Sequence, residues 1–348
     1  MNDKHHKPRI GITIGDINGI GPEVIIKALS DNRITNHFTP VIYGSGKVLS
    51  YYRKLMNSED FNYSPIKDGE HFNHKKVNVM NCWEEDIDIQ PGIATSESGR
   101  ASRMAILKCA EDLKNKIIDA VVTAPINKKT IQSDDFKFPG HTEYFTQTFD
   151  AKSSLMLLLS QNLRVGVVTG HIPLKEVSDQ LTKELIADKL SILLQSLKID
   201  FGINKPKVAV LGLNPHAGEE GLLGNEEINM IQPVISDFKN KGNIVQGSFS
   251  ADGFFGTGQY ANYDGILAMY HDQGLIPFKT IAFENGVNYT AGISIVRTSP
   301  DHGTAYNLAG KNVASESSIR EAMFLAADIV SSRANQQELS QQSLQNKS

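Results

Sequence analysis

Short runs of β-branched and other apolar residues alternate along the chain with stretches of helical periodicity, and this alternation limits the possible folds more than any other feature of the sequence. Strands are predicted at 10–14, 41–43, 77–81, 120–123, 155–159, 165–169, 208–213, 244–246, 265–270 and 293–296. Helices are predicted at 22–29, 97–114, 183–197, 226–240 and 315–332. Because the strands are apolar throughout, both of their faces should be buried. The pattern therefore predicts an α/β fold with mostly parallel sheets covered by helices.

Composition narrows the class of protein. The 348 residues suit two domains or one large one, and no repeat or long linker marks a boundary. Lys and Arg total 35 against 39 Asp and Glu, with no basic block, so we expect a small-molecule partner and no nucleic acid. Cys82 and Cys109 form no C-x-x-C pair and the first residues lack an apolar export segment, which favours a reducing cytoplasm. No apolar run approaches the roughly 20 residues of a membrane helix. Residues 334–348 are polar and are expected to form a frayed helix end or a disordered tail.

Three of the ten histidines come directly or shortly after strand-like runs: His171 after VGVVTG, His216 after VAVLGLNP and His271 after GILAMY. Ligands of open α/β folds bind outside the carboxyl ends of parallel strands, and neutral imidazole is a common ligand of zinc and related ions. We therefore predict a metal site. Asp252 and Asp272 could orient the imidazoles or join the coordination. The alternative is that each histidine is a lone structural residue, which is less favoured for three together.

Other candidate binding residues have weaker sequence signals. His141 and Thr142 follow a Pro-Gly turn and could hold an anion or a substrate hydroxyl, but a helix start capped by Thr142 explains them equally well. The stretch from Asp301 to Thr304 resembles a turn before a helix start, which suits phosphate or ribose contacts.

Lys279, Asn288 and Arg297 supply polar and cationic groups for an acidic substrate. For any one of the cations taken alone, a solvated surface charge is the favoured interpretation.

A dinucleotide, if bound, is not held in the Rossmann manner. GDINGIGPE follows a strand but is not G-x-G-x-x-G, and nothing in the chain matches the Walker loop. Gly256, Gly258 and Ala261 fit G-x-G-x-x-A formally, but the residues around them do not form a strand followed by a helix start.

Eight stretches, in order from about residue 10 to 311, together resemble one family: GDINGIGPE, TAPINK, GHTEYF, VVTGHIPL, GLNPHAGEEGLLGNEE, ADGFF, AMYHDQGLIPFK and GVNYTAGISIVRTSPDHGTAYNLAGK. The family is the 4-hydroxythreonine-4-phosphate dehydrogenases of pyridoxal 5'-phosphate biosynthesis. The resemblance implies an isocitrate/isopropylmalate dehydrogenase-like fold of two α/β lobes with a cleft between them. It also implies a homodimer whose interface completes each active site. We expect residues 1–130 with 280–333 to form the cofactor-side lobe, residues 131–279 the lobe with the metal ligands and dimer interface, and 334–348 a tail.

The resemblance also assigns roles to residues. It implies metal binding by His171 and His216 together with His271 of the partner subunit. The implied substrate contacts are His141, Thr142, Lys279, Asn288 and Arg297, the implied catalytic set is His141, Lys279 and Asp272, and cofactor contacts are expected at Asp301, His302, Gly303 and Thr304. NAD or NADP and one divalent ion (Zn, Mg, Co or Mn) would serve as cofactors. Ile17-Asn18 and Asn307 depart from the Pro-Ala and the acidic residue that the family often has at these positions.

The activity implied is oxidation and decarboxylation of 4-phosphooxy-L-threonine to 3-amino-2-oxopropyl phosphate, a step toward vitamin B6. Two alternatives stay open. One is a dehydrogenase of threonate or erythronate 4-phosphate, and the other is a metal- and phosphate-binding protein without redox turnover.

Overall fold

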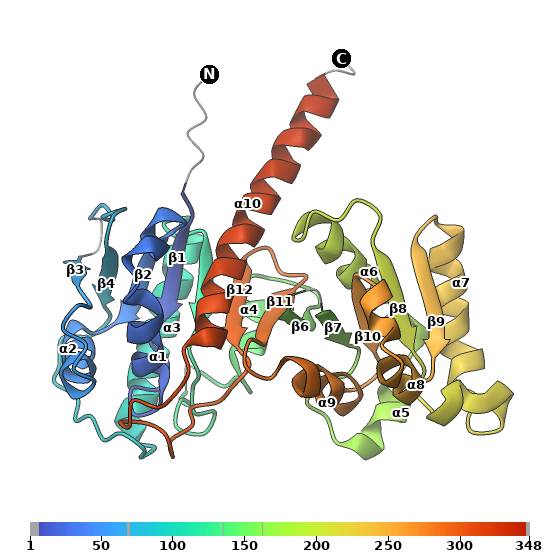
Figure 1. Cartoon of the computed structure of the whole chain (residues 1–348), viewed down its shortest axis with the longest axis horizontal. Helices are drawn as coiled ribbons and strands as arrows, with labels where there is room; N and C mark the ends of the chain where they lie inside the picture. The colour runs from blue at the N-terminus through green and yellow to red at the C-terminus, as the bar shows by residue number, and fades with distance from the viewer. Residues whose placement is uncertain (1–6, 68–69, 135, 162, 346–348) are drawn as a thin grey trace. The chain divides into compact units, whose positions relative to one another are not determined.

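The computed structural model describes residues 7–67, 70–134, 136–161 and 163–345 (Figure 1). The chain divides into two compact units. Unit 1 comprises Met1–Asp150 and Ser294–Ser331, and unit 2 comprises Ala151–Ile293 and Ser332–Ser348. The division differs from the expected lobes, because residues 131–150 belong to unit 1 and residues 280–293 to unit 2.

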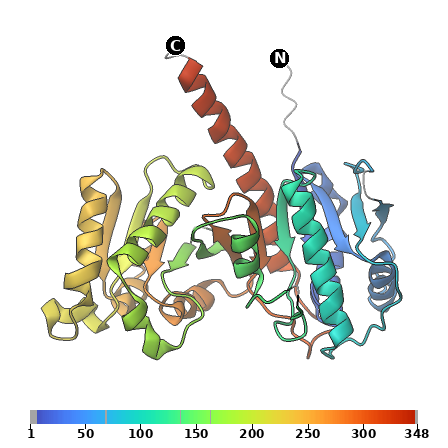
Figure 2. The same cartoon turned by 180° about the vertical axis from the view of Figure 1, so that it is seen from behind.

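Unit 1 contains a parallel sheet in the order β3-β4-β2-β1-β5-β12. Its strands are β1 (Arg9–Thr13), β2 (Thr39–Gly44), β3 (Tyr63–Ile66), β4 (Val77–Asn81), β5 (Ala120–Thr123) and β12 (Val296–Pro300). Its helices are α1 (Gly21–Leu29), η1 (Asn32–Asn36), α2 (Gly46–Leu55), α3 (Ser96–Lys114), α4 (His141–Thr148) and the first part of α10 (Ser317–Gln345). Helices α1 and α3 cover opposite faces of this sheet, as Figures 1 and 2 show.

Unit 2 contains a mixed sheet in the order β11-β6-β7-β10-β8-β9. Its strands are β6 (Leu155–Ser160), β7 (Leu163–Val167), β8 (Lys207–Leu211), β9 (Ile244–Phe249), β10 (Gly265–Ala268) and β11 (Val287–Ala291). Strand β6 runs antiparallel to β7 and β11, whereas β7, β10, β8 and β9 are parallel to one another. Its helices are η2 (Leu174–Glu176), α5 (Val177–Gln180), α6 (Lys183–Ile199), η3 (Pro215–Gly221), the π-helical turn η4 (Glu227–Ile231), α7 (Gln232–Asn240), α8 (Ala251–Gly256), η5 (Gln259–Asn262) and α9 (His271–Ala282).

Helices also cover both faces of the sheet in unit 2. Val165 and Val167 of β7 share one apolar cluster with residues of α9, while Gly265 of β10 lies against leucine side chains of α6. Because Ile266 pairs with Val165 and successive strand residues face opposite sides, α9 and α6 lie on opposite faces. Gly274 allows α9 to approach closely, since a Cβ there would lie 3.0 Å from Cγ1 of Val165. The first turn of α9 is therefore packed closely against β7 and β10.

The predicted α/β class with mostly parallel strands is confirmed. The predicted lists lack β3, α2, α5 and α8, and three further local differences have a clear physical reason. The run 293–296 is not a strand: β11 ends at Ala291, Gly292 turns with φ +87°, and β12 begins at Val296. Ile293 is buried within that turn, and burial gives turn residues the same apolar signal as a strand. Helix α9 was not predicted, because Gly274 and Pro277 interrupt its sequence pattern.

The third difference concerns the C-terminal helix, α10, which continues to Gln345, well past the predicted end at residue 332. Polar composition alone had suggested a frayed end or a tail. No helix in the described part of the chain is long and apolar enough to cross a membrane.

Candidate active site

The three strand-end histidines of unit 2 follow three neighbouring parallel strands. His171 follows β7, His271 follows β10 and His216 follows β8, and β10 pairs with both of the other strands. The carboxyl ends of parallel neighbours share one edge of the sheet, so the fold delivers the three imidazoles to the same side. The rings of His171 and His271 lie with centroids 5.3 Å apart. The resemblance had implied that His271 meets the other ligands from the partner subunit, yet within one chain it already lies beside His171.

His271 is the first residue of α9 and is held by its neighbours. Its Nδ1 is 2.7 Å from Oδ1 of Asp272, a contact that fixes the ring and leaves the lone pair on Nε2 when Nδ1 carries the proton. Gln273 connects the ends of two strands, since its Oε1 accepts from the backbone N–H of Met269 and its Nε2 donates to the carbonyl of Gly212. The HDQ triplet of the sequence therefore orients the imidazole and braces the turn beneath it.

His216 lies in an unusual turn. It has φ 52° and ψ 26°, and each residue from His216 to Glu220 has a positive φ. The side chain is exposed, and its charge is among the minor causes that lower the pKa of Asp252, after the hydrogen bond from Ser250. Among the described residues, no three His, Cys, Asp or Glu side chains gather as a metal site would require. One chain therefore provides a pair of imidazoles and a third histidine on the neighbouring strand's loop.

Arg297 forms the centre of the predicted substrate residues in unit 1. Its guanidinium donates to Oγ1 of Thr123 from Nη2 at 2.7 Å and from Nε at 3.1 Å, and Nη1 is 3.4 Å from Oγ1 of Thr142. The side chain is only 3 % exposed, and burial lowers the pKa of Arg297 to about 10, while the charge of Glu143 acts in the opposite sense. A buried cation held by hydroxyl groups is well suited to a carboxylate or phosphate.

His141 lies beside this arginine as the first residue of α4. The helix is capped by the backbone of Gly140, so the alternative in which Thr142 caps it was wrong, although a helix does start here. His141 is 8 % exposed, and its Nε2 is buried with no hydrogen-bond partner. Burial, reinforced by the charges of Arg297 and Lys128, holds the pKa of His141 well below its usual range. The imidazole is therefore neutral at pH 7, and its buried Nε2 has no hydrogen-bond partner within the chain.

The expected cofactor segment, Asp301 to Thr304, is held by the first glycine motif. The N–H of Ile20 donates to the carbonyl of Thr304 at 3.0 Å, and the hydroxyl of Tyr306 donates to Oδ2 of Asp16 at 2.7 Å. Turns follow the segment, and the next helix begins only at Ser317, so the expected helix start was wrong.

Glu23, in the same glycine motif, extends this contact to the turns after Thr304, because its carboxylate accepts from the N–H groups of Gly310 and Asn312. Asn18, one of the departures from the family pattern, also has a structural role. Its side chain accepts from the N–H of Gln90 at 2.8 Å and donates to the carbonyl of Ile93 at 2.9 Å. These long-range bonds had no signal in the sequence.

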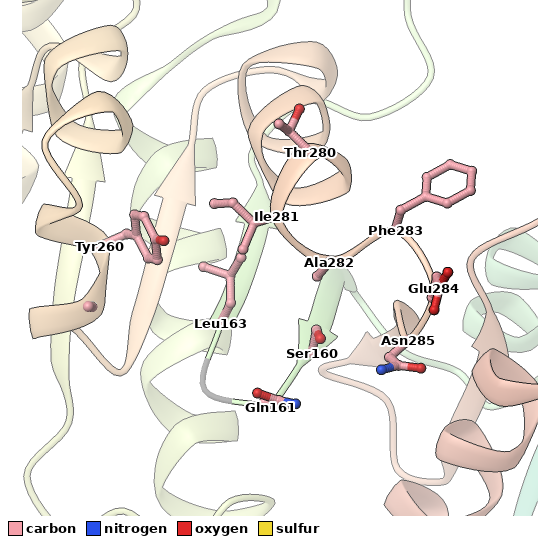
Figure 3. A pocket seen from close by; sticks show the side chains of 11 residues that line it. Ser160, Gln161, Leu163, Tyr260, Thr280, Ile281, Ala282, Phe283, Glu284 and Asn285 are labelled. Carbon is pink, nitrogen blue, oxygen red and sulfur yellow. The ribbon is translucent and has the colours of Figure 1, made fainter.

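Lys279 and Asn288 lie in unit 2, on the last turn of α9 and in β11. The Oδ1 atom of Asn288 is buried without a hydrogen-bond partner. A pocket of about 590 Å³ is formed by the segment between these two residues, together with the β6–β7 turn and η5 (Figure 3). Its lining consists of Ser160, Gln161, Leu163, Tyr260, Ala261, Thr280, Ile281, Ala282, Phe283, Glu284 and Asn285. None of the predicted site residues lines it.

The fold matches a solved structure closely. The crystal structure of 4-hydroxythreonine-4-phosphate dehydrogenase from Klebsiella pneumoniae aligns with a TM-score of 0.80 and 31 % identity, over 94 % of this chain and 100 % of that one. The fold is thus that of an α/β dehydrogenase.

The sequence comparisons are more specific. The family model of the pyridoxal phosphate biosynthetic protein PdxA matches residues 36–326. The 4-hydroxythreonine-4-phosphate dehydrogenase of Bacteroides thetaiotaomicron is 49 % identical over 331 residues, which cover 95 % of this chain and 91 % of that protein. A putative D-threonate 4-phosphate dehydrogenase of Oceanobacillus iheyensis is 37 % identical over 93 % of this chain and 98 % of its own length. The chain belongs to the PdxA family.

Proposed function

We propose that the protein oxidises and decarboxylates 4-phosphooxy-L-threonine to 3-amino-2-oxopropyl phosphate, with NAD or NADP and a divalent metal ion, in the cytoplasmic synthesis of pyridoxine 5'-phosphate. The observation that carries the proposal is the pair of imidazoles at neighbouring strand ends, His171 and His271, at 5.3 Å between ring centroids. The 49 % identity to a 4-hydroxythreonine-4-phosphate dehydrogenase supports the substrate.

The residues present fit a divalent ion. Imidazole nitrogens suit zinc and cobalt, whereas manganese and magnesium would need the help of carboxylates. His171 and His271 would hold the ion from one chain, and we propose that His216 completes the set across a homodimer, because it stands on an exposed turn and the described residues of one chain bring no third ligand together with the pair. Held by these residues, the ion would supply Lewis-acid polarisation of the substrate's C3 oxygen and stabilisation of the charge left by the departing CO₂, and the nicotinamide would supply the hydride acceptor.

The chain's own residues bind and orient the substrate. Arg297 and Lys279 offer cations to its phosphate and carboxylate, and fixing these remote groups aligns C3 for reaction. Nε2 of neutral His141 can accept a hydrogen bond or a proton from a substrate group, with Thr142 beside it. Asp272 holds the His271 ring in its orientation.

A turnover assay tests the proposal. The purified protein is given 4-phosphooxy-L-threonine with NAD or NADP, and reduced nicotinamide is followed by absorbance, with chelator and then metal added back. We expect turnover that chelator abolishes and metal restores. An inactive protein that still binds metal and phosphate would refute dehydrogenation and favour the non-redox alternative.

A related substrate is the second candidate, because the putative D-threonate 4-phosphate dehydrogenase of Oceanobacillus iheyensis covers nearly the whole chain. Assays of threonate and erythronate 4-phosphate beside the amino acid substrate decide between them by the ratio of kcat/KM values.

A further inference from the structure

The backbone conformation of the turn that carries His216 is unfavourable. His216, Ala217, Glu219 and Glu220 have φ values between 42° and 56°, in the left-handed region that residues with a Cβ seldom adopt. Each such residue costs on the order of 1 kcal/mol, and a run of them persists only when the surroundings hold it in place. Whatever holds this turn therefore also sets the direction of the His216 side chain.

Glu227 is the buried carboxylate that holds the start of this turn, beside the more exposed Glu226, which accepts from the side-chain amide of Asn214 at 2.8 Å. Oε1 of Glu227 accepts from the backbone N–H of Leu213 at 2.7 Å and from that of Asn214 at 2.8 Å, directly before the left-handed run. Its Oε2 accepts from the side-chain amide of Asn214 at 3.0 Å. The carboxylate belongs to a residue only 3 % exposed, so these charge-assisted bonds form away from water, where they are strong.

The turn is shaped around this carboxylate. Gly218 has φ +81°, and a Cβ at this position would lie 2.6 Å from Oε2 of Glu227. A Cβ on Gly212 would lie 3.1 Å from Oε1. Glu227 also begins the π-helical turn Glu227–Ile231, an element often found at functional sites. The glycines on both sides of the His216 segment thus leave room for one buried acidic side chain.

We propose that Glu227 is a positioning residue for the metal site: it fixes the left-handed turn at 216–220 and thereby aims His216 at the ion. The inference rests on the proposed function, in which His216 is a ligand. Because the bonds of Glu227 go to backbone groups before His216, its loss should move the imidazole while leaving the ligand itself present.

The first variant is Glu227→Gln, which keeps the shape but replaces the charge. The amide accepts hydrogen bonds more weakly, and its NH₂ group opposes the side-chain amide of Asn214. We expect the Kd for Zn²⁺ or Co²⁺, measured by isothermal titration on the full-length dimer, to rise about 10- to 100-fold. Metal in excess should restore kcat, because the ligands remain.

The matched control is Asp200→Asn, another buried carboxylate of unit 2. Asp200 is 6 % exposed and binds Arg333, Tyr289 and Ser196, none of which belongs to the metal site. The Asp200→Asn substitution should lower the melting temperature of the protein and leave its Kd for metal unchanged. A merely structural role for Glu227 predicts the same result for both variants.

Gly218→Ala gives a second test if Glu227→Gln folds poorly, because the added methyl collides with the same carboxylate and should weaken metal binding in the same way. Wild-type Kd values in Glu227→Gln and Gly218→Ala, with binding lost in His216→Ala, would overturn the positioning role. Unchanged binding in His216→Ala and His171→Ala would overturn the metal assignment itself, and the inference with it.

Discussion

Dimers that carry a different histidine variant in each subunit test how the proposed metal site is assembled. The structure pairs His171 with His271 in one chain and leaves His216 on an exposed turn. If each site takes the pair from one subunit and His216 from the other, a subunit with His171→Ala and a subunit with His216→Ala build one intact site and one that lacks both groups. Each homodimer of a single variant has no intact site.

The expected magnitude follows from this count of sites. Co-expression with two different affinity tags and purification on both yields heterodimers only. The His171→Ala/His216→Ala heterodimer should have about half of the wild-type kcat, because one of its two sites is complete. The His171→Ala/His271→Ala heterodimer should have almost none, since both lost groups come from the same pair and each site then lacks one of them.

The assay is metal-dependent formation of reduced nicotinamide, with each homodimer as the baseline. The opposite result, recovery with His171→Ala/His271→Ala and none with His171→Ala/His216→Ala, would refute the assignment and show that His271 of the partner subunit enters the site, as the family resemblance implies. No recovery in any combination would mean that all three ligands come from one chain.

Three further changes test single residues. Arg297→Lys should lower kcat/KM by about 100-fold, because a lysine cannot reproduce the bonds of the buried guanidinium to Thr123. Steady-state kinetics measure this ratio, and near wild-type values would exclude a contact between Arg297 and the substrate. Gly274→Ala should destabilise the fold by about 1–2 kcal/mol in urea denaturation, since the new methyl meets Val165 and the alanine's better helix propensity offsets only part of the strain. The pKa of His141 is lowered on folding, so its contribution to stability is complete above about pH 6.5 and is lost as the pH falls toward the folded-state pKa. Below pH 6.5, the free energy of unfolding should therefore fall less steeply with pH in His141→Gln than in the wild type, and the two slopes should differ by at most the binding of one proton. Parallel curves of unfolding free energy against pH would contradict the burial effect.

The candidate metal residues were predictable because they occupy simple positions in the chain. An apolar run followed by a histidine gives both the strand and the end at which the ligand sits, so His171, His216 and His271 could be placed at one edge of a sheet from sequence alone. The sequence could not predict that His171 and His271 lie side by side while His216 is exposed on a turn of its own. The strained turn at His216 depends on Glu227, and no local pattern indicates that a nearby glutamate folds back onto the backbone.

Helix α9 shows the opposite case, in which local pattern was misleading. Gly274 and Pro277 are poor helix formers, and together they hid a helix that begins at His271. The structure explains the glycine, since a Cβ at this position would be in tight contact with Val165, against which α9 packs. Packing against β7 therefore outweighs the unfavourable propensity, and that packing fixes the first turn that carries His271 and Asp272.

The two glycine-containing motifs of unit 1 show why motif matching alone was inconclusive for the cofactor. GDINGIGPE follows a strand and precedes a helix, the usual place of a dinucleotide fingerprint, yet its acidic residues are used within the protein. Asp16 accepts from Tyr306, and Glu23 accepts from the N–H groups of Gly310 and Asn312. A buried carboxylate already bonded to backbone amides would repel a pyrophosphate. The GDINGIGPE motif therefore supports the segment that follows β12. Any dinucleotide contact in unit 1 is best sought on that segment, from Asp301 to Thr304.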